Sequence, residues 1–478
     1  REAGQATEPQ QSVPHESIAV LPFVNMSADP DQEYFSDGIS EELLNLLAAV
    51  PDLKVISRTS AFFYKNKEVK LSQVAEELNV AHILEGSVRK AGNQVRVTAQ
   101  LIEAKSDTHL WSETYDRTLD DIFAIQDEIA AAVVEQLKIT LLGDVPQTRE
   151  VDPEAYSLYL QARHLGSLGS ADGYEQSIEL FKQALDVEPQ YAAAWEGLSR
   201  NYVNQAAVGL ADSDEAYSAA RDAAQRALEI DPDYALAHGR LGWIAVQHDN
   251  DLSAGARHFE RGLALEPENI DLIRNAIVPL ISLNRKAENV ALNEFVVTRD
   301  PLNTVVHTNM GFVYYLDSQW DKAINSYRTA LRLSPDAITT NAFIGFSLLR
   351  KGEPKAALTQ IVDEKFELLR LLGLMMAYHD LGDPQASDQA LAELNEKFAD
   401  NWSYYIAGGL AYRGESDRAF EMLEQALAQG SQGLSYIPSD PMFDNLRTDP
   451  RWTPLLEKMG KSPAQLQAIE FKVTLPGG

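Results

Sequence analysis

The sequence predicts an α+β N-terminal domain, a mixed sheet with packed helices, followed by an all-α superhelix of paired-helix repeats. Three observations predict this order. Residues 17–141 alternate runs of period two with helical runs, which is typical of strands and helices in one domain. From about Asp152 onward the apolar spacing is helical and recurs. The length of 478 residues exceeds the roughly 250 to 300 residues at which a single core stops growing, so more than one domain is expected.

The first domain is expected over residues 17–145, behind a disordered linker at 1–16 that is rich in Gln, Glu, Ala and Pro. We interpret this linker as the end of a longer upstream segment. The elements expected in the domain are, in order, a buried strand at 17–24, a helix at 36–49, a strand at 53–56, a helix at 71–78, alternating strands over 82–117 and a helix at 122–142.

The second domain is marked by a motif that recurs at the end of each repeat. In this motif an apolar pair, often Ala-Leu, is separated from a proline by three residues. The prolines of successive copies lie 43, 35, 34 and 34 residues apart: Pro189, Pro232, Pro267, Pro301 and Pro335. Thirty-four residues is the tetratricopeptide (TPR) period. The chain resembles that family over residues 152–429, with about seven repeats, some of them degenerate.

Close packing explains the residue types in the best copy. Gly311 and Ala323 let two antiparallel helices approach, Tyr327 fills the remaining volume, and Pro335 ends the second helix. The spacing between Pro354 and Phe398 does not fit the period. Residues 430–478 are predicted to form a segment that caps the last exposed repeat.

A partner-binding groove is expected along the first helices of the repeats, as the TPR resemblance implies. Its lining would be apolar and aromatic with a few polar members: Trp243, Val278, Phe312, Tyr315, Phe346, Leu349, Arg200, Asn204 and Arg350. In the functional interpretation, a protein or peptide lies in the groove with the aromatic residues as anchors. In the alternative, several of these residues are buried between repeats or under the N-terminal domain.

The first domain also carries specific strings: SIAVLPF, EYFSDGISEELL, ISRTSAF, LEGSVRKAGNQVRVTAQLI, HLWSETYDR and DIFAIQDEIA. They resemble the TolB-like N-terminal domain that precedes TPR repeats in many bacterial proteins. The resemblance implies the exported half of a membrane-tethered winged-helix transcriptional regulator of the CadC-like architecture. Other relatives attach the pair of domains to adenylate cyclase or kinase domains.

Charge and composition exclude several functions. A net charge of -30 repels phosphate backbones and anionic membrane surfaces, so direct contact with nucleic acid is not expected. The absence of cysteine excludes disulfides, thiolate metal sites and cysteine nucleophiles. No apolar run reaches about 18 residues, so attachment to a membrane would come only from an upstream segment. We expect no metal and no cofactor.

No catalytic residues are expected. Glu85-Gly86-Ser87 lacks the surroundings of a nucleophile elbow and is better explained by a bulge or a close backbone approach. Arg58 and Arg89, on an acidic domain, are candidates for ion pairs with Glu85 or Asp116, or for binding an anion.

The function that the sequence favours is therefore a non-enzymatic interaction and sensory module, the periplasmic part of a membrane-tethered transcriptional regulator or a related signalling protein. A periplasmic scaffold for envelope assembly or polysaccharide export is the alternative, and a cytoplasmic location is the alternative to the periplasm. The sequence leaves a homo-oligomer open.

Overall fold

The computed structural model of the protein describes residues 13–138 and 150–476. Most of the linker expected at 1–16, and the boundary expected between 145 and 152, lie outside these residues. The N-terminal domain contains β1 (Ser17–Val20), β2 (Val24–Asn25), η1 (Pro30–Gln32), α1 (Glu33–Ala48), β3 (Lys54–Val55), α2 (Arg58–Phe62), α3 (Leu71–Leu78), β4 (His82–Ala91), β5 (Gln94–Glu103), β6 (Thr108–Thr118), η2 (Leu119–Asp121) and α4 (Ile122–Gln136).

One mixed sheet organises this domain. Its strand order is β3-β1-β4-β5-β6, and β2 pairs with β4 beyond the end of β1. β1 runs parallel to β3 and β4, whereas β4, β5 and β6 form antiparallel pairs. Helices α1 and α4 share one core with one face of the sheet, and α2 and α3 share a second core with the other face. The expected α+β domain is confirmed.

Two local features differ from the expectation. Helix α1 begins at Glu33, three residues earlier than expected. Asp37 therefore lies inside the helix and is 5% exposed. Helix α2 has only five residues, too few to show a helical period in the sequence.

The second domain is a TPR-like helical repeat region. Its helices are α5 (Pro153–Ser167), α6 (Ala171–Val187), α7 (Ala192–Ala207), α8 (Ser213–Ile230), α9 (Ala235–Gln247), α10 (Leu252–Leu265), α11 (Ile270–Ser282), α12 (Lys286–Arg299), α13 (Thr304–Leu316), α14 (Trp320–Leu333), α15 (Thr340–Arg350), α16 (Pro354–Ile361), α17 (Glu367–Asp380), α18 (Pro384–Phe398), α19 (Ser403–Tyr412) and α20 (Ser416–Ala428).

Each helix packs on its neighbour in sequence, and the first helices of successive pairs also contact one another, as α13 does with α15. The close approach expected at Gly311 is confirmed: a Cβ atom there would lie 2.7 Å from the Tyr327 ring. Gly242 faces Phe259 in the same way. A side chain at either glycine would push the two helices apart.

Within the described residues the array has eight helix pairs, one more than the seven or so expected. The extra pair comes from residues 354–398, where the expected period failed. Helix α16 is short, at 8 residues. After it, the buried carboxylate of Glu364 accepts hydrogen bonds from the backbone N–H groups of Thr339, Ala342 and Phe366. This side chain thus connects the chain after α16 to the start of α15.

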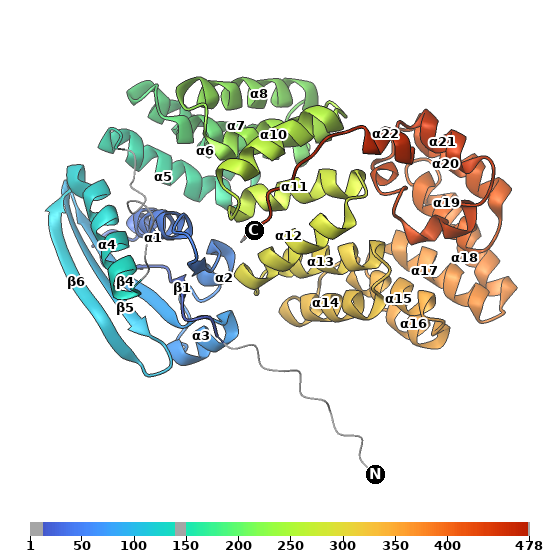
Figure 1. Ribbon diagram of the computed structural model, residues 1–478, viewed down its shortest axis with the longest axis horizontal. Helices are drawn as coiled ribbons and strands as arrows, with labels where there is room; N and C mark the ends of the chain where they lie inside the picture. Colours follow the sequence, from blue (N-terminus) through green and yellow to red (C-terminus); the bar gives the residue numbers. More distant parts are fainter. Residues whose placement is uncertain (1–12, 139–149, 477–478) are drawn as a thin grey trace, which may run out of the picture.

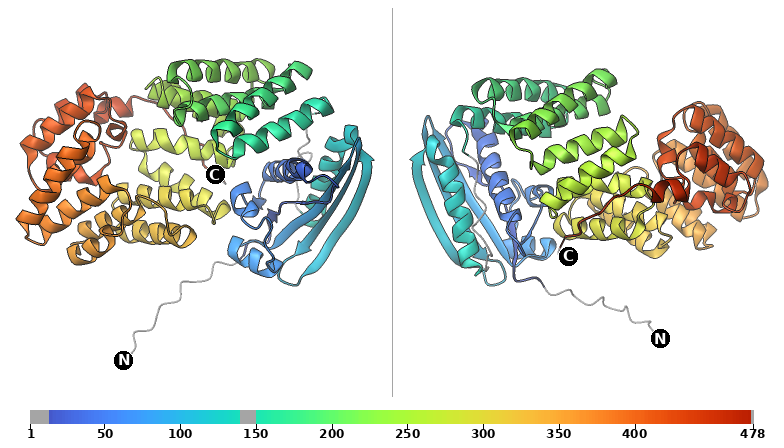
Figure 2. Two further views of the ribbon diagram at one scale, coloured as in Figure 1. Left: turned by 180° about the vertical axis from the view of Figure 1, so that it is seen from behind. Right: turned by 45° about the horizontal axis from the view of Figure 1, so that its top comes forward.

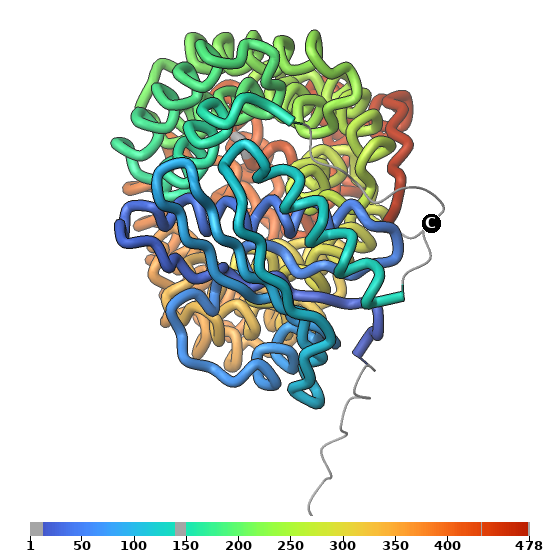
Figure 3. The backbone as a smooth tube through the Cα atoms, turned by 90° about the vertical axis from the view of Figure 1, so that its left-hand side faces the viewer, coloured from blue at the N-terminus to red at the C-terminus, as the bar shows by residue number. Residues whose placement is uncertain are grey.

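After α20 the chain forms η3 (Gln432–Ser435), η4 (Pro441–Leu446), α21 (Trp452–Lys458) and α22 (Pro463–Gln467). Residues 468–476 then run without helix or strand back toward α10 and α11 (Figure 1). The helices of the array curve around a central region, with α5 to α10 on one side and α13 to α20 on the other (Figure 2). The α/β domain lies against one side of this curve, with its sheet facing away from the array (Figure 3).

Candidate functional site

The inner surface of the array is where the sequence predicts a partner, and three of its expected lining residues are buried. Tyr315, on α13, is 1% exposed, and Phe346 and Leu349, on α15, are also buried. The expectation that these side chains line an open groove is wrong. Each belongs to the large core that the C-terminal repeats share with the segment after α20.

Two more of the expected residues contact that segment directly. The ring of Phe312 packs edge-on against Tyr436, with centroids 5.1 Å apart. The guanidinium of Arg350 lies 3.2 Å from the carboxylate of Asp444 and over the ring of Tyr412. Both side chains therefore hold the chain itself in the structure.

Residues 431–447 form this covering segment. The hydroxyl of Tyr404, on α19, donates to Asp440 at 2.7 Å. Met442 packs against Gly408, where a Cβ atom would lie 2.9 Å from its sulfur. The space left between the segment and the α11–α13 region is a cavity of about 10 Å³, the size of a single water molecule. The C-terminal half of the expected groove is thus filled by its own chain.

The remaining four expected residues lie nearer the α/β domain and are half-buried: Arg200, Asn204, Trp243 and Val278. Arg200 makes no ion pair with any residue in the described ranges, although its charge lowers the pKa of Glu196. Burial raises that pKa, and Arg240 and Arg200 outweigh it. These side chains stay candidates for contact with a partner.

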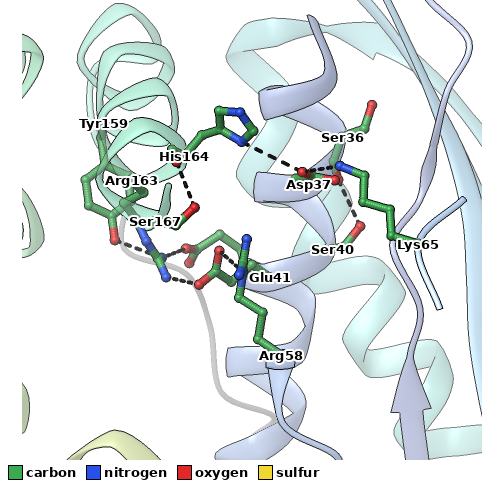
Figure 4. A network of polar contacts seen from close by, with 11 residues as sticks. Ser36, Asp37, Ser40, Glu41, Arg58, Lys65, Tyr159, Arg163, His164 and Ser167 are labelled. Carbon is green, nitrogen blue, oxygen red and sulfur yellow. Dashed lines mark hydrogen bonds and ion pairs between the residues drawn. The ribbon is translucent and has the colours of Figure 1, made fainter. Parts of the chain in front are cut away.

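A partly buried polar junction joins the α/β domain to the first repeat (Figure 4). Arg163, on α5, forms ion pairs with Glu41 and Glu42 of α1, the second at 2.8 Å. Arg58, on α2, donates from Nε to the other oxygen of Glu41 at 3.1 Å. Arg163 also donates to the hydroxyl of Tyr159. One glutamate thus connects two helices of the α/β domain with the array.

The electrostatics of the junction are those of a buried ion cluster. Burial raises the pKa of Glu41, but the charges of Arg163 and Arg58 outweigh it and hold the pKa below its ordinary value. For Glu42 burial dominates and the pKa is raised, although Arg163 opposes it. Removing Arg163 would leave the largely buried Glu42 without an ion-pair partner and Glu41 with Arg58 alone.

A second junction lies far away in sequence. Ser60, on α2, donates to Asp300 at 2.7 Å, and Ser57 donates to the same carboxylate. The backbone N–H of Leu302 donates in turn to the hydroxyl of Ser60 at 3.0 Å. Asp300, at the turn between α12 and α13, is 1% exposed. The α/β domain is therefore bound at two separate places in the array.

A cavity of about 870 Å³ lies in the α/β domain. Its walls come from the connection between β1 and β2, from the segment between α2 and α3, and from the polar face of β4 and β5. Glu85 lines it without any hydrogen bond or ion pair to a described residue, and burial raises the pKa of this carboxyl. The volume and the mixed lining suit a small polar ligand.

The cavity connects with the first junction through Lys65. This side chain lines the cavity and donates to Asp37 at 2.6 Å, and it pairs with Glu33 at 2.7 Å. Asp37 lies one turn before Glu41 on α1, and its carboxylate is 3.8 Å from the His164 ring of α5. Figure 4 shows Asp37 of α1 between His164 of α5 and Lys65.

The other expectations for this domain have mixed outcomes. Arg58 forms an ion pair, as expected, but its partner is Glu41 and not Glu85 or Asp116. Asp116 is bound by Arg96 instead. Arg89 is exposed and makes no ion pair within the described ranges.

The close backbone approach expected at Gly86 is confirmed, because a Cβ atom there would lie 2.2 Å from the carbonyl oxygen of Thr98. The Phe23 ring occupies the space beside it.

Sequence reasoning missed the residues of both junctions: Glu41, Glu42, Arg163, Ser57, Ser60 and Asp300. Their contacts join positions 122 and 240 residues apart, so no local period marks them.

In residues 13–138 and 150–476 no helix is both long enough and apolar enough to cross a membrane. Over the same residues, no three His, Asp or Glu side chains are arranged to hold a metal ion.

Part of the chain is similar to known proteins. Residues 14–132 match the family described as HilA/YgeH-like transcriptional regulator, second domain. A curated protein of Rhizobium meliloti (strain 1021), named "Putative adenylate cyclase 3", is 42% identical over 209 residues, which cover 42% of this chain and 36% of that protein. The chain thus spans about a third of the length of this relative.

Among solved structures, Pseudomonas aeruginosa PilF is 18% identical, with a TM-score of 0.35, over 42% of this chain and 91% of that chain. YrrB, described as a TPR protein with an unusual peptide-binding site, is 18% identical, with a TM-score of 0.28, over 46% of this chain and 96% of that chain. With such low scores, the repeat fold is assigned here from the helix pairs themselves.

Proposed function

We propose that the chain is a non-enzymatic sensory and interaction module of a larger bacterial signalling protein, with a TolB-like domain as its input and the TPR array as its partner-binding part. The observation that carries this proposal is the double attachment of the α/β domain. Through Glu41 it binds the first repeat, and through Ser60 it binds the turn at Asp300. A change in the α/β domain would therefore move two separate parts of the array relative to each other.

In this proposal the cavity in the α/β domain is the site at which the input signal binds. Its wall includes residues 64–69, which are separated from the end of α2 by a single residue. Helix α2 carries the contacts to Asp300, and Lys65 contacts Asp37 on α1. A ligand that displaces the segment after α2 would thus act on both junctions. It would bind the displaced and undisplaced states with different affinities, which an allosteric signal requires.

The finer proposal is that the chain is the periplasmic part of a membrane-tethered transcriptional regulator. The match of residues 14–132 to a transcriptional regulator domain supports it, as does the net charge of -30, which disfavours direct contact with DNA. We expect the gene upstream of Arg1 to encode a transmembrane helix and, before it, a DNA-binding domain. An upstream region without a transmembrane helix would contradict this localisation.

A second candidate is the regulatory part of a nucleotide cyclase, favoured by the 42% identity to the protein named as an adenylate cyclase. A third is a periplasmic scaffold, which would have a signal peptide and no output domain. The upstream sequence separates the three.

In each case this chain itself would catalyse nothing. Incubated with ATP, the purified chain should form no cyclic AMP, and turnover by this chain would overturn the non-enzymatic assignment.

The coupling itself can be tested in the full-length protein with a transcriptional reporter, or with cyclase output if that domain is present. Asp300→Ala should change the response to the native stimulus at an unchanged protein level. Asp336→Ala, which removes an exposed carboxylate paired with Lys365, is the matched control and should respond like the wild type. A normal response from Asp300→Ala would contradict coupling through this junction.

A further inference from the structure

The segment 468–476 lies on the array in the manner of a bound peptide. It leaves α22 and extends toward α10 and α11 (Figure 1). Its side chains alternate between inside and outside: Phe471 is 6% exposed, Ile469 and Val473 are half-buried, and Glu470 and Lys472 are exposed. Such alternation is the pattern of an extended chain that lies with one face on a surface.

The array holds the main chain of this segment with two side chains. Glu260, on α10, accepts a hydrogen bond from the backbone N–H of Lys472 at 3.1 Å. Arg285, at the turn between α11 and α12, donates to the carbonyl oxygen of Ile469 at 3.5 Å. Contacts of this kind recognise an extended backbone whatever its side chains. The apolar side chains at alternate positions are the part that the surface can select.

The segment is held much less firmly than the one that fills the groove. In residues 431–447, Ile437, Phe443 and Leu446 are fully buried. In contrast, the described backbone of residues 470–476 makes no hydrogen bond to any other main-chain group. Its attachment therefore rests on the two side-chain contacts, on the deeply buried ring of Phe471 and on the half-buried side chains of Ile469 and Val473.

We propose that the surface under this segment, which we call the tail site and define by Glu260 and Arg285, is a peptide-binding site whose resident occupant is the chain's own segment. Its external ligand is an extended peptide of a partner protein with apolar or aromatic residues at alternate positions, and binding requires displacement of residues 468–476. The inference rests on the proposed role of the array as the partner-binding part. A tethered occupant has an effective concentration of the order of millimolar, so a partner must bind more tightly than the isolated segment does.

A synthetic peptide of residues 468–476 with a fluorescent label tests the proposal by polarisation. It should bind a variant that ends at Gln467 at least tenfold more tightly than it binds the full chain. The same peptide with Phe471→Ala should bind the truncated variant much more weakly, whereas the peptide with Glu470→Ala, an exposed position, should bind as before. Peptide binding is measured in vitro, so its failure leaves the upstream-sequence and reporter tests of the proposed function untouched.

Full-chain variants keep the test decisive if truncation prevents folding. Phe471→Ala in the full chain should increase binding of the wild-type peptide. Lys472→Pro removes the backbone N–H that donates to Glu260 and should also increase binding of the wild-type peptide. Lys472→Ala keeps this N–H and should leave peptide binding unchanged.

Equal binding to the full chain and to folded variants lacking the contacts would overturn the proposal, as would no binding to either. A full-chain dimer that disappears on truncation would also overturn it, because the segment would then occupy a second copy.

Discussion

The hydroxyl of Ser60 donates to the carboxylate of Asp300 at 2.7 Å, although the two residues are 240 positions apart. Asp300 also accepts from Ser57 and Asn303. This single buried carboxylate fastens α2 of the α/β domain to the middle of the helical array. Together with the junction at Glu41, it attaches the α/β domain to the array.

Asp300→Ala should therefore loosen α2 and the α12–α13 turn together. It leaves three buried donors without their acceptor, which costs about 1–3 kcal/mol for each group left unsatisfied. Native-state hydrogen exchange should show faster exchange at Ser60 and Leu302. With Asp336→Ala, whose carboxylate is exposed, exchange at these residues should stay at the wild-type rate. Unchanged exchange in Asp300→Ala would show that the contact is not formed in solution.

Arg163→Ala should be the most damaging change at the first junction. It leaves Glu42 without its ion-pair partner and Glu41 with Arg58 alone, at side chains that are 17% exposed. Breaking a fully buried ion pair costs about 3–5 kcal/mol, so a cost toward the lower end of that range is expected. Thermal unfolding should show a large fall in melting temperature. Arg96→Ala, which removes an exposed pair with Asp116, should change it little. Equal effects of the two changes would mean that the junction is hydrated and open.

Tyr315→Ala tests whether the aromatic residues of the expected groove hold the protein's own chain. The side chain is 1% exposed, so its removal should destabilise the C-terminal repeats by about 3 kcal/mol or more, as for other large core residues. Hydrogen exchange in residues 431–447 should accelerate. Phe63→Ala, at an exposed position, serves as the control. A stable Tyr315→Ala protein that loses affinity for an external partner would instead support an open groove lined by Tyr315.

The pH dependence of stability should include a contribution from His258. Burial, followed by His238 and nearby arginines, lowers its pKa to about 4. Between pH 6.5 and about 4 the unfolded chain binds a proton that the folded chain does not, so stability falls as the pH falls through this window. His258→Gln should flatten that fall in the melting temperature. His379→Gln, at an exposed residue, should leave it unchanged. An unchanged slope in His258→Gln would show that the ring titrates normally.

Much of the fold follows from local patterns in the sequence. The helix expected at 71–78 matches α3. The spacing of Gly311 and Tyr327 predicted the contact between two helices that the structure shows. Each of these features is encoded within about one repeat length. Helix α2 escaped detection because five residues contain little more than one turn.

The site could be predicted only in part, for a physical reason. The TPR resemblance placed Phe312 and Arg350 on the inner surface, and the structure has them in contact with Tyr436 and Asp444. Nothing in their spacing indicates that the covering segment comes from the same chain. Burial against a distant segment and burial against a partner require the same apolar residues, so composition cannot distinguish them.

The contacts of Glu41 and Asp300 hold the α/β domain in one position on the array. Because the chain has no cysteine, Lys105→Cys and Val305→Cys, at exposed positions in the two domains, can carry spin labels at these two sites alone. Pulsed electron–electron double resonance should give a single narrow distribution of the distance between the two labels. This distribution should broaden when Arg163→Ala and Asp300→Ala are added. A broad or multiple distribution in the otherwise unchanged protein would contradict this single position.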